Sequence, residues 1–330
     1  MPLMRSLDES VVVITGASSG IGAATAHELA RRGASVVLAA RSADALETVA
    51  DECHTLGGRA VPVPTDVTDL AAVERLAARA AAVFGRIDAW VNNAGVSAYG
   101  RIDEVPVDQW RRVIDVTLMG TVYGVRAALP YLRAAGGGVL VNNASVLAAV
   151  TMPYISAYDT AKHGVRGLSN TVRQELHAAG DHTISVCTVL PASIDTPFFR
   201  HSANHTGREL RPPPPVYPPE VAARTIVRVI QRPRREAYAG GAARALEFQW
   251  RMAPALMERV LRAYAARFQF GPSPAAPTAG GLFAGGTADA RQDGGWHGRR
   301  RRAVRATAAL GLAAGTAAGT VAAVARRVRR

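Results

Sequence analysis

The chain has 330 residues, of which 48% are hydrophobic and 20% charged, and a formal net charge of +13. This length can bury a sizeable core, as one large domain with an appendage or as two smaller domains. Cys53 and Cys187 are too few and too distant for a disulfide framework or a metal-ligand cluster. Residues 1–10 lack the basic segment and apolar run of a signal peptide, so we expect a cytoplasmic protein.

The positive charge is concentrated at the end of the chain. From Gly271 onward, ten arginines face only two acidic residues, a net +8, which leaves +5 for the first 270 residues. A nucleic-acid site in such a tail would be expected to interleave stacking aromatics, and only Trp296 is near. We therefore rank nucleic-acid binding last and expect no specific nucleic-acid partner.

The first motif follows a short β-branched run at residues 11–14, which is typical of a buried parallel strand. The run continues into a turn, Thr15-Gly-Ala-Ser-Ser-Gly-Ile-Gly22, and then into an Ala-rich helical pattern through Arg32. A strand, a glycine turn and a helix start form a phosphate site, because the backbone can approach closely and the helix presents free N–H groups. The glycine spacing differs from the commoner dinucleotide fingerprint.

A second strand, residues 35–40, ends at Arg41. In dinucleotide folds this strand end faces the adenosine ribose, where an acid binds the 2′-hydroxyl and an arginine accommodates a 2′-phosphate. Residues 39–42 contain no acid, so NADP(H) is favoured over NAD(H). The alternative is that Arg41 is only a solvated loop residue.

Strands and helices then alternate along the chain. Further strands are predicted at 60–64, 87–91, 139–141 and 184–190. Helices are predicted at 43–56, 70–84 and 108–132, over a stretch that includes 158–176, and at 219–231 and roughly 242–269. This alternation implies an α/β fold with a doubly wound parallel sheet.

The segments outside this pattern differ in composition. Residues 191–218 form an irregular Pro-rich stretch that we expect to act as a substrate lid. Residues 271–298, rich in Gly, Ala and Pro, are expected to be a flexible linker. In the basic tail, 299–330, twenty uncharged residues (306–325) are long enough for a membrane helix, but ten are Ala and only four are Leu or Val. The weak hydropathy favours a disordered basic tail. Membrane-surface association is the alternative.

Tyr158 and Lys162 are four residues apart on a predicted helix, so their side chains share one face. Lys162 is the only lysine of the chain, and lysine offers a compact charge where arginine offers a wide planar head. A phenol beside a cation is suited to proton transfer.

Together these motifs resemble the short-chain dehydrogenase/reductase family over about residues 8–270. The resemblance rests on Thr15–Gly22, Asn92-Asn-Ala-Gly95, Ser145, Tyr158–Lys162 and Leu190-Pro-Ala-Ser-Ile-Asp-Thr-Pro197. It implies a single Rossmann-like domain, residues 1–270, with a parallel sheet of about seven strands and a nicotinamide cofactor.

The resemblance also implies roles for individual residues. Tyr158 would exchange a proton with the substrate oxygen, Ser145 would bond that oxygen, and Lys162 would lower the Tyr158 pKa and hold the nicotinamide ribose. The implied cofactor-binding residues, with Arg41 added from its place after the second strand, are Gly16, Ser18, Ser19, Gly20, Ile21, Gly22, Arg41, Asp66, Val67, Asn93, Tyr158, Lys162, Ile194 and Thr196. Family members commonly form dimers or tetramers through helices equivalent to 108–132 and 155–177, so we expect a homo-oligomer.

Two positions depart from the family pattern. Thr117 stands where the family usually has Asn, whose backbone carbonyl supports a water that links the lysine to solvent, and Ala192 stands where Gly is common. The leading interpretation is an oxidoreductase that transfers hydride between NADP(H) and an apolar carbonyl or secondary alcohol. The alternative is a catalytically weak nucleotide-binding sensor or scaffold, for which Thr117 is the only support.

Overall fold

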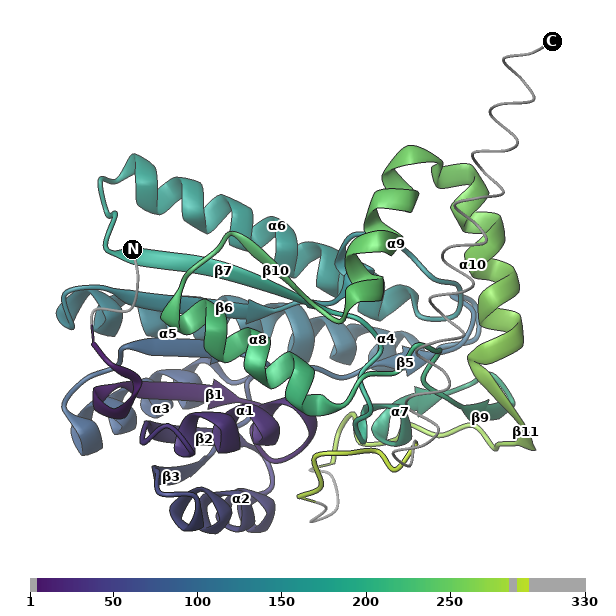
Figure 1. Ribbon diagram of the computed structural model, residues 1–330. Helices are drawn as coiled ribbons and strands as arrows, with labels where there is room; N and C mark the ends of the chain where they lie inside the picture. Colours follow the sequence, from purple (N-terminus) through teal and green to yellow (C-terminus); the bar gives the residue numbers. More distant parts are fainter. Residues whose placement is uncertain (1–4, 285–289, 297–330) are drawn as a thin grey trace.

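The protein is described here by a computed structural model of residues 5–284 and 290–296. Its centre is a seven-stranded sheet in which every strand pair is parallel, in the order β10-β7-β6-β4-β1-β2-β3 (Figure 1). The strands are β1 (Val11–Thr15), β2 (Ser35–Ala40), β3 (Arg59–Pro64), β4 (Ala89–Asn92), β6 (Gly138–Asn143), β7 (Ile184–Pro191) and β10 (Glu236–Ala239). The predicted fold class, a doubly wound parallel sheet of about seven strands, is confirmed.

Helices cover both faces of the sheet. One face carries α1 (Gly20–Ala30), α2 (Ala43–Thr55) and α8 (Pro219–Gln231). The other carries α3 (Leu70–Phe84), α5 (Gly120–Ala134) and α6 (Ser156–Ala178). Because both faces are buried, the central strands read as continuous apolar runs rather than alternating ones.

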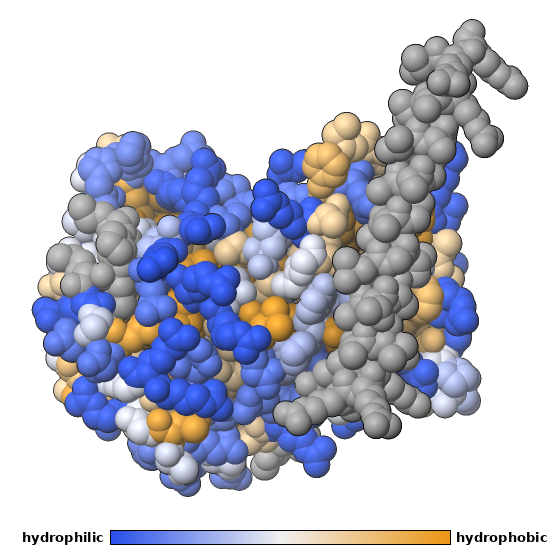
Figure 2. Space-filling view, in the orientation of Figure 1, coloured by the Kyte–Doolittle hydropathy of each residue, from blue (hydrophilic) through white to orange (hydrophobic). Residues whose placement is uncertain are grey.

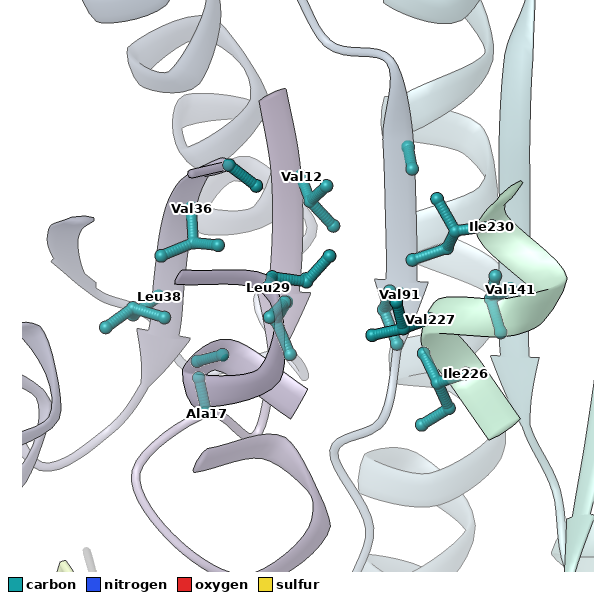
Figure 3. Packing of buried hydrophobic residues seen from close by; sticks show 14 of the residues in the cluster. Val12, Ala17, Leu29, Val36, Leu38, Val91, Val141, Ile226, Val227 and Ile230 are labelled. Carbon is teal, nitrogen blue, oxygen red and sulfur yellow. The ribbon is translucent and has the colours of Figure 1, made fainter. Parts of the chain in front are cut away.

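The core between the sheet and its first helical layer is drawn in Figure 3. Val12 and Val91, from neighbouring strands, point toward Leu29 of α1 and Ile226 of α8, and all four side chains are fully buried. Burying a side chain of this size stabilises the fold by about 1.5–3 kcal/mol. The layer fixes α1 against the end of β1, where the glycine turn lies.

The long helix predicted for residues 108–132 is continuous but not uniform. α4 (Val107–Ile114) leads into a π-helical segment, η2 (Asp115–Met119), and then into α5. Such π turns often mark functional sites. Thr117, the residue that departs from the family pattern, lies in this turn.

Within the central sheet, β10 is the strand that the sequence did not predict. It has only four residues, Glu-Ala-Tyr-Ala, and is preceded by Arg234 and Arg235. It pairs along the edge of β7, and a four-residue edge strand gives too short a pattern to recognise.

Beyond the central sheet, the predicted lid contains α7 (Phe198–His201), β8 (Ala203–Asn204) and β9 (Arg208–Leu210). β8 pairs with β5 (Ala98–Tyr99), and β9 pairs with β11 (Phe270–Pro274). The helical stretch predicted at 242–269 is two helices, α9 (Gly241–Met252) and α10 (Pro254–Phe268), because Pro254 starts a new helix. They form a hairpin that rises beside the end of the sheet (Figure 1).

The segment expected to be a flexible linker, 271–298, lies against the domain wherever it is described. Its first residues belong to β11, and Leu282 is fully buried. Composition did not predict this, because one buried leucine and several backbone hydrogen bonds hold the segment. No helix among the described residues is long and apolar enough to cross a membrane. The tail at 299–330 lies outside the described residues.

Candidate active site

Ser145, Tyr158 and Lys162 meet where β6 ends and α6 begins. Ser145 follows β6 and caps a short 3-10 helix, its Oγ accepting a hydrogen bond from the Leu147 N–H at 3.1 Å. Lys162 is 4% exposed, and its Nζ donates to the Asn143 carbonyl at 2.6 Å and lies 5.5 Å from the Tyr158 ring centroid. The helical spacing of four therefore does bring the phenol and the ammonium to one point.

Burial dominates the electrostatics of this cluster. It raises the pKa of Tyr158 above its ordinary value, an effect that a hydrogen bond with Ser145 opposes and the nearby Asp159 reinforces. Burial also lowers the pKa of Lys162 to about 7. Burial penalises the charged form of both groups, and the expected lowering of the Tyr158 pKa by Lys162 stays a prediction.

Thr117 lies beneath the cluster. Its hydroxyl is hydrogen-bonded to the Val96 N–H and carbonyl, both at 3.2 Å, and its own carbonyl accepts from the Thr121 hydroxyl at 2.9 Å. The second departure, Ala192, does not require a positive φ, so its Cβ causes no backbone strain.

The glycine turn after β1 has the geometry of a phosphate cradle. Gly16 (φ +65°) and Gly20 (φ +55°) adopt left-handed conformations that favour glycine. Asn93 closes the turn, because its Nδ2 donates to the Thr15 and Gly16 carbonyls at 3.0 Å. Gly22 does not line the cavity above the turn; it packs so closely on Gly16 that an added Cβ would collide with the Gly16 carbonyl. The bare turn and the N–H groups at the start of α1 fit a dinucleotide pyrophosphate.

Charged residues lie around the ends of β2 and β3. Asp66 accepts hydrogen bonds from Thr68 and, at 2.8 Å, from Arg112. Burial opposes ionisation of Asp66, but these hydrogen bonds prevail and its pKa lies below the ordinary value. Arg41 lies beside this pair, and Arg112 is a second cation that the sequence motifs did not identify. Two cations at this edge suit a phosphorylated ribose.

One cavity of about 2940 Å³ joins these features. Every predicted site residue except Gly22 lines it, including Ser145, Tyr158, Lys162, Arg41 and Thr196. Motifs that are far apart in the sequence thus line one cavity. They converge because parallel strands end at one edge of the sheet.

The substrate end of the cavity is apolar. Phe198 of α7 lies 5.3 Å from the Tyr158 ring, centroid to centroid. On the hairpin, Phe248 and Met252 line the cavity yet are 65% and 71% exposed, and Leu256 and Val260 extend the same surface. Figure 2 shows apolar surface at the top of this hairpin, across a hollow from the body of the domain. The sequence analysis found the helices but not this apolar lining, because its periodicity resembles that of an ordinary core face.

The chain was compared with known proteins. Residues 10–206 match the family model described as short chain dehydrogenase. The chain is 35% identical over 276 residues to the uncharacterised oxidoreductase YxnA of Bacillus subtilis, covering 83% of this chain and 77% of that one. It is 44% identical over 191 residues to a cis-4-hydroxycyclohexanecarboxylate dehydrogenase of Sinomonas cyclohexanicum, covering 58% and 75%.

Among solved structures, it is similar to the alcohol dehydrogenase of the archaeon Thermococcus sibiricus complexed with 5-hydroxy-NADP. The two share 28% identity at a TM-score of 0.61, over 69% of this chain and 95% of the other. The family match spans more than half of the chain and includes the glycine turn and the Ser145, Tyr158 and Lys162 cluster. The chain belongs to the short-chain dehydrogenase family and is an NAD(P)-dependent oxidoreductase that acts on CH–OH groups.

Proposed function

We propose that the protein interconverts an apolar secondary alcohol and its ketone with NADP(H), and that Tyr158 is the general acid and base. The observation that carries the proposal is the convergence of Ser145, Tyr158 and Lys162 in the cavity that also contains the glycine turn and the apolar hairpin. The bound nicotinamide would supply or accept the hydride.

The residues of the chain would handle the proton and the substrate oxygen. In the reducing direction, the Tyr158 hydroxyl donates its proton to the substrate oxygen, to which the Ser145 hydroxyl also hydrogen-bonds. The ammonium of Lys162, when charged, stabilises the phenolate left on Tyr158. Reprotonation of Tyr158 completes the cycle, and oxidation follows the same steps in reverse.

The preference for NADP(H) is supported by Arg41 and by the absence of an acid at residues 39–42. The neighbouring Arg112, which is hydrogen-bonded to the cavity residue Asp66, adds positive charge beside Arg41. The Thermococcus relative in complex with an NADP derivative is consistent with this preference. Arg41→Asp should weaken NADPH binding and improve the use of NADH; an unchanged preference would remove Arg41 from the argument.

The substrate class is proposed from the cavity. Ligand pockets usually occupy about 300–1,000 Å³, whereas this cavity measures about 2940 Å³ before any cofactor binds. Phe248 and Met252 present exposed apolar surface to it. We therefore propose a bulky or elongated apolar substrate, and cyclic alcohols should be included because one relative is a cis-4-hydroxycyclohexanecarboxylate dehydrogenase.

The test is NADPH binding, followed by nicotinamide fluorescence, and then a scan of ketones of increasing apolar size for NADPH oxidation. Tyr158→Phe keeps the ring and removes the proton, so turnover should be lost while NADPH still binds. Near-normal turnover of Tyr158→Phe would refute the assigned mechanism. Phe248→Ser and Met252→Ser should raise KM most for the largest ketones if the hairpin contacts substrate.

We also propose a homo-oligomer that forms through α4–α5 and α6, as is common in the family. Light scattering on the purified protein tests this, and a monomer at micromolar concentration would contradict it.

A further inference from the structure

Two described pieces of the C-terminal segment, residues 275–284 and 290–296, lie across the cofactor end of the cavity. We name them together the C-terminal strap. The first piece follows β11 and continues past α7, where it appears in yellow in Figure 1. Neither piece matches any of the motifs by which the family was identified, and the family match ends at residue 206.

The first piece occupies the hydrogen-bond donors of Arg41. Its Nη2 donates to the Gly281 carbonyl at 2.7 Å, and its Nη1 donates to the carbonyls of Leu282 and Phe283 at 3.1 and 3.0 Å. Arg112 Nε donates to the same Leu282 carbonyl at 3.1 Å. Three consecutive backbone oxygens thus contact the planar fork with which an arginine would hold phosphate oxygens.

The second piece contacts the start of α1. The Gly20 N–H donates to the Arg291 carbonyl at 3.1 Å, at the helix end proposed to hold the pyrophosphate. Asp195 accepts from the backbone N–H groups of Gly294 and Trp296 at 3.0 and 3.2 Å. Gln292 is hydrogen-bonded to the buried His27 of α1 at 2.6 Å.

The strap is anchored as well as hydrogen-bonded. Leu282 is 0% exposed and packs in a cluster with Ala98, Val105, Val113, Ala157 and Ala203. Thr278 and Asn204 exchange two backbone hydrogen bonds, and the Gly281 N–H donates to the His201 carbonyl. None of these anchoring contacts involves the Arg41 side chain, so the strap can be loosened without changing Arg41.

We propose that the C-terminal strap is an intramolecular competitor of the cofactor. Its carbonyl oxygens use the donors of Arg41 and Gly20 that the 2′-phosphate and pyrophosphate would need. The cofactor must displace the strap. Its apparent affinity is therefore its intrinsic affinity multiplied by the fraction of molecules in which the strap is unbound. The inference rests on the proposed NADP(H) function, and it makes the strap a determinant of cofactor affinity and of the preference for a 2′-phosphate.

Two neighbouring glycines of the strap provide a matched test in the full chain. Gly280 has φ +53°, and an added Cβ would lie 2.5 Å from the His201 carbonyl oxygen. At Gly281 the same Cβ meets nothing closer than 3.6 Å. Gly280→Ala should therefore loosen the strap, and Gly281→Ala is the control. The left-handed conformation alone costs an alanine about 1–2 kcal/mol, so Gly280→Ala should bind NADPH about 5- to 30-fold more tightly.

The readout is the Kd of NADPH and of NADH from nicotinamide fluorescence, without any turnover. We expect Gly280→Ala to tighten NADPH more than NADH, because NADH has no 2′-phosphate and does not need the Arg41 donors that the first piece occupies. We expect Gly281→Ala to match the unaltered protein. Leu282→Asp, which removes the buried anchor, should act in the same direction. Unchanged or weaker NADPH binding in both Gly280→Ala and Leu282→Asp would overturn the strap proposal. If neither the variants nor the unaltered protein bind NADPH or NADH, the proposed function itself fails.

Discussion

Asp159, between Tyr158 and Lys162, should make the stability of the protein fall as pH rises. It is 5% exposed; Oδ2 accepts the Met152 N–H at 2.8 Å, whereas Oδ1 has no hydrogen-bond partner among the described residues. Burial raises the pKa of Asp159 to about 8 from an ordinary 3.8. Between these values the folded protein holds a proton that the unfolded chain releases, so the free energy of unfolding falls as pH rises from about 4 to 8.

Asp159→Asn should remove this loss. The amide keeps an acceptor for the Met152 N–H and carries no charge at any pH. Each pH unit in the window is worth up to about 1.4 kcal/mol, so from pH 5 to pH 7 the variant should gain up to about 3 kcal/mol over the unaltered protein. Lys162 does not complicate the comparison, because it is present in both proteins.

Urea unfolding followed by tryptophan fluorescence at pH 5 and pH 7 measures the difference. Asp51→Asn is the matched control, because it removes an exposed carboxylate from α2 without altering the interior. The reasoning is refuted if Asp159→Asn differs from the unaltered protein by the same amount at both pH values.

Four further substitutions test other parts of the structure. Gly22→Ala should abolish NADPH binding in the fluorescence titration, because the new Cβ would collide with the Gly16 carbonyl. Gly167→Ala lies in open space on α6 and should raise the free energy of unfolding by up to about 1 kcal/mol. Asn142→Ala should lower the free energy of unfolding in urea by about 1–3 kcal/mol, because the buried Asn92 Nδ2 loses its acceptor and the Ser169 hydroxyl keeps only its bond to the Val165 carbonyl. Thr117→Asn should leave kcat equal or higher, and a large loss would show that the proton relay has been misplaced.

The sequence determined the parts of this protein that depend on local pattern. Apolar runs alternating with helical periodicity gave the doubly wound sheet, since each strand must be buried by the helices that flank it in sequence. The glycine turn before α1 and the spacing of Tyr158 and Lys162 are also local, because backbone conformation and helix geometry fix them within a few residues. Their convergence was predictable, since parallel strands end at one edge of the sheet.

Where the local pattern was weak, only the tertiary structure could decide. β10 is an edge strand whose four residues are ordered by pairing with β7. The segment after β11 has a linker composition, yet Leu282 finds a pocket formed by residues distant in sequence. Asp159 follows Tyr158 on an ordinary helix, and its pKa is raised because other elements bury it.

The same distinction applies to Arg41. Its place after β2 could be read from the sequence, but its hydrogen bonds to the carbonyls of residues 281–283 could not. Contacts across 240 residues depend on how the whole chain packs, and backbone carbonyls carry no sequence signal. The sequence thus determined which cofactor chemistry suits the cavity. Only the tertiary structure decided that the carbonyls of residues 281–283 contact Arg41.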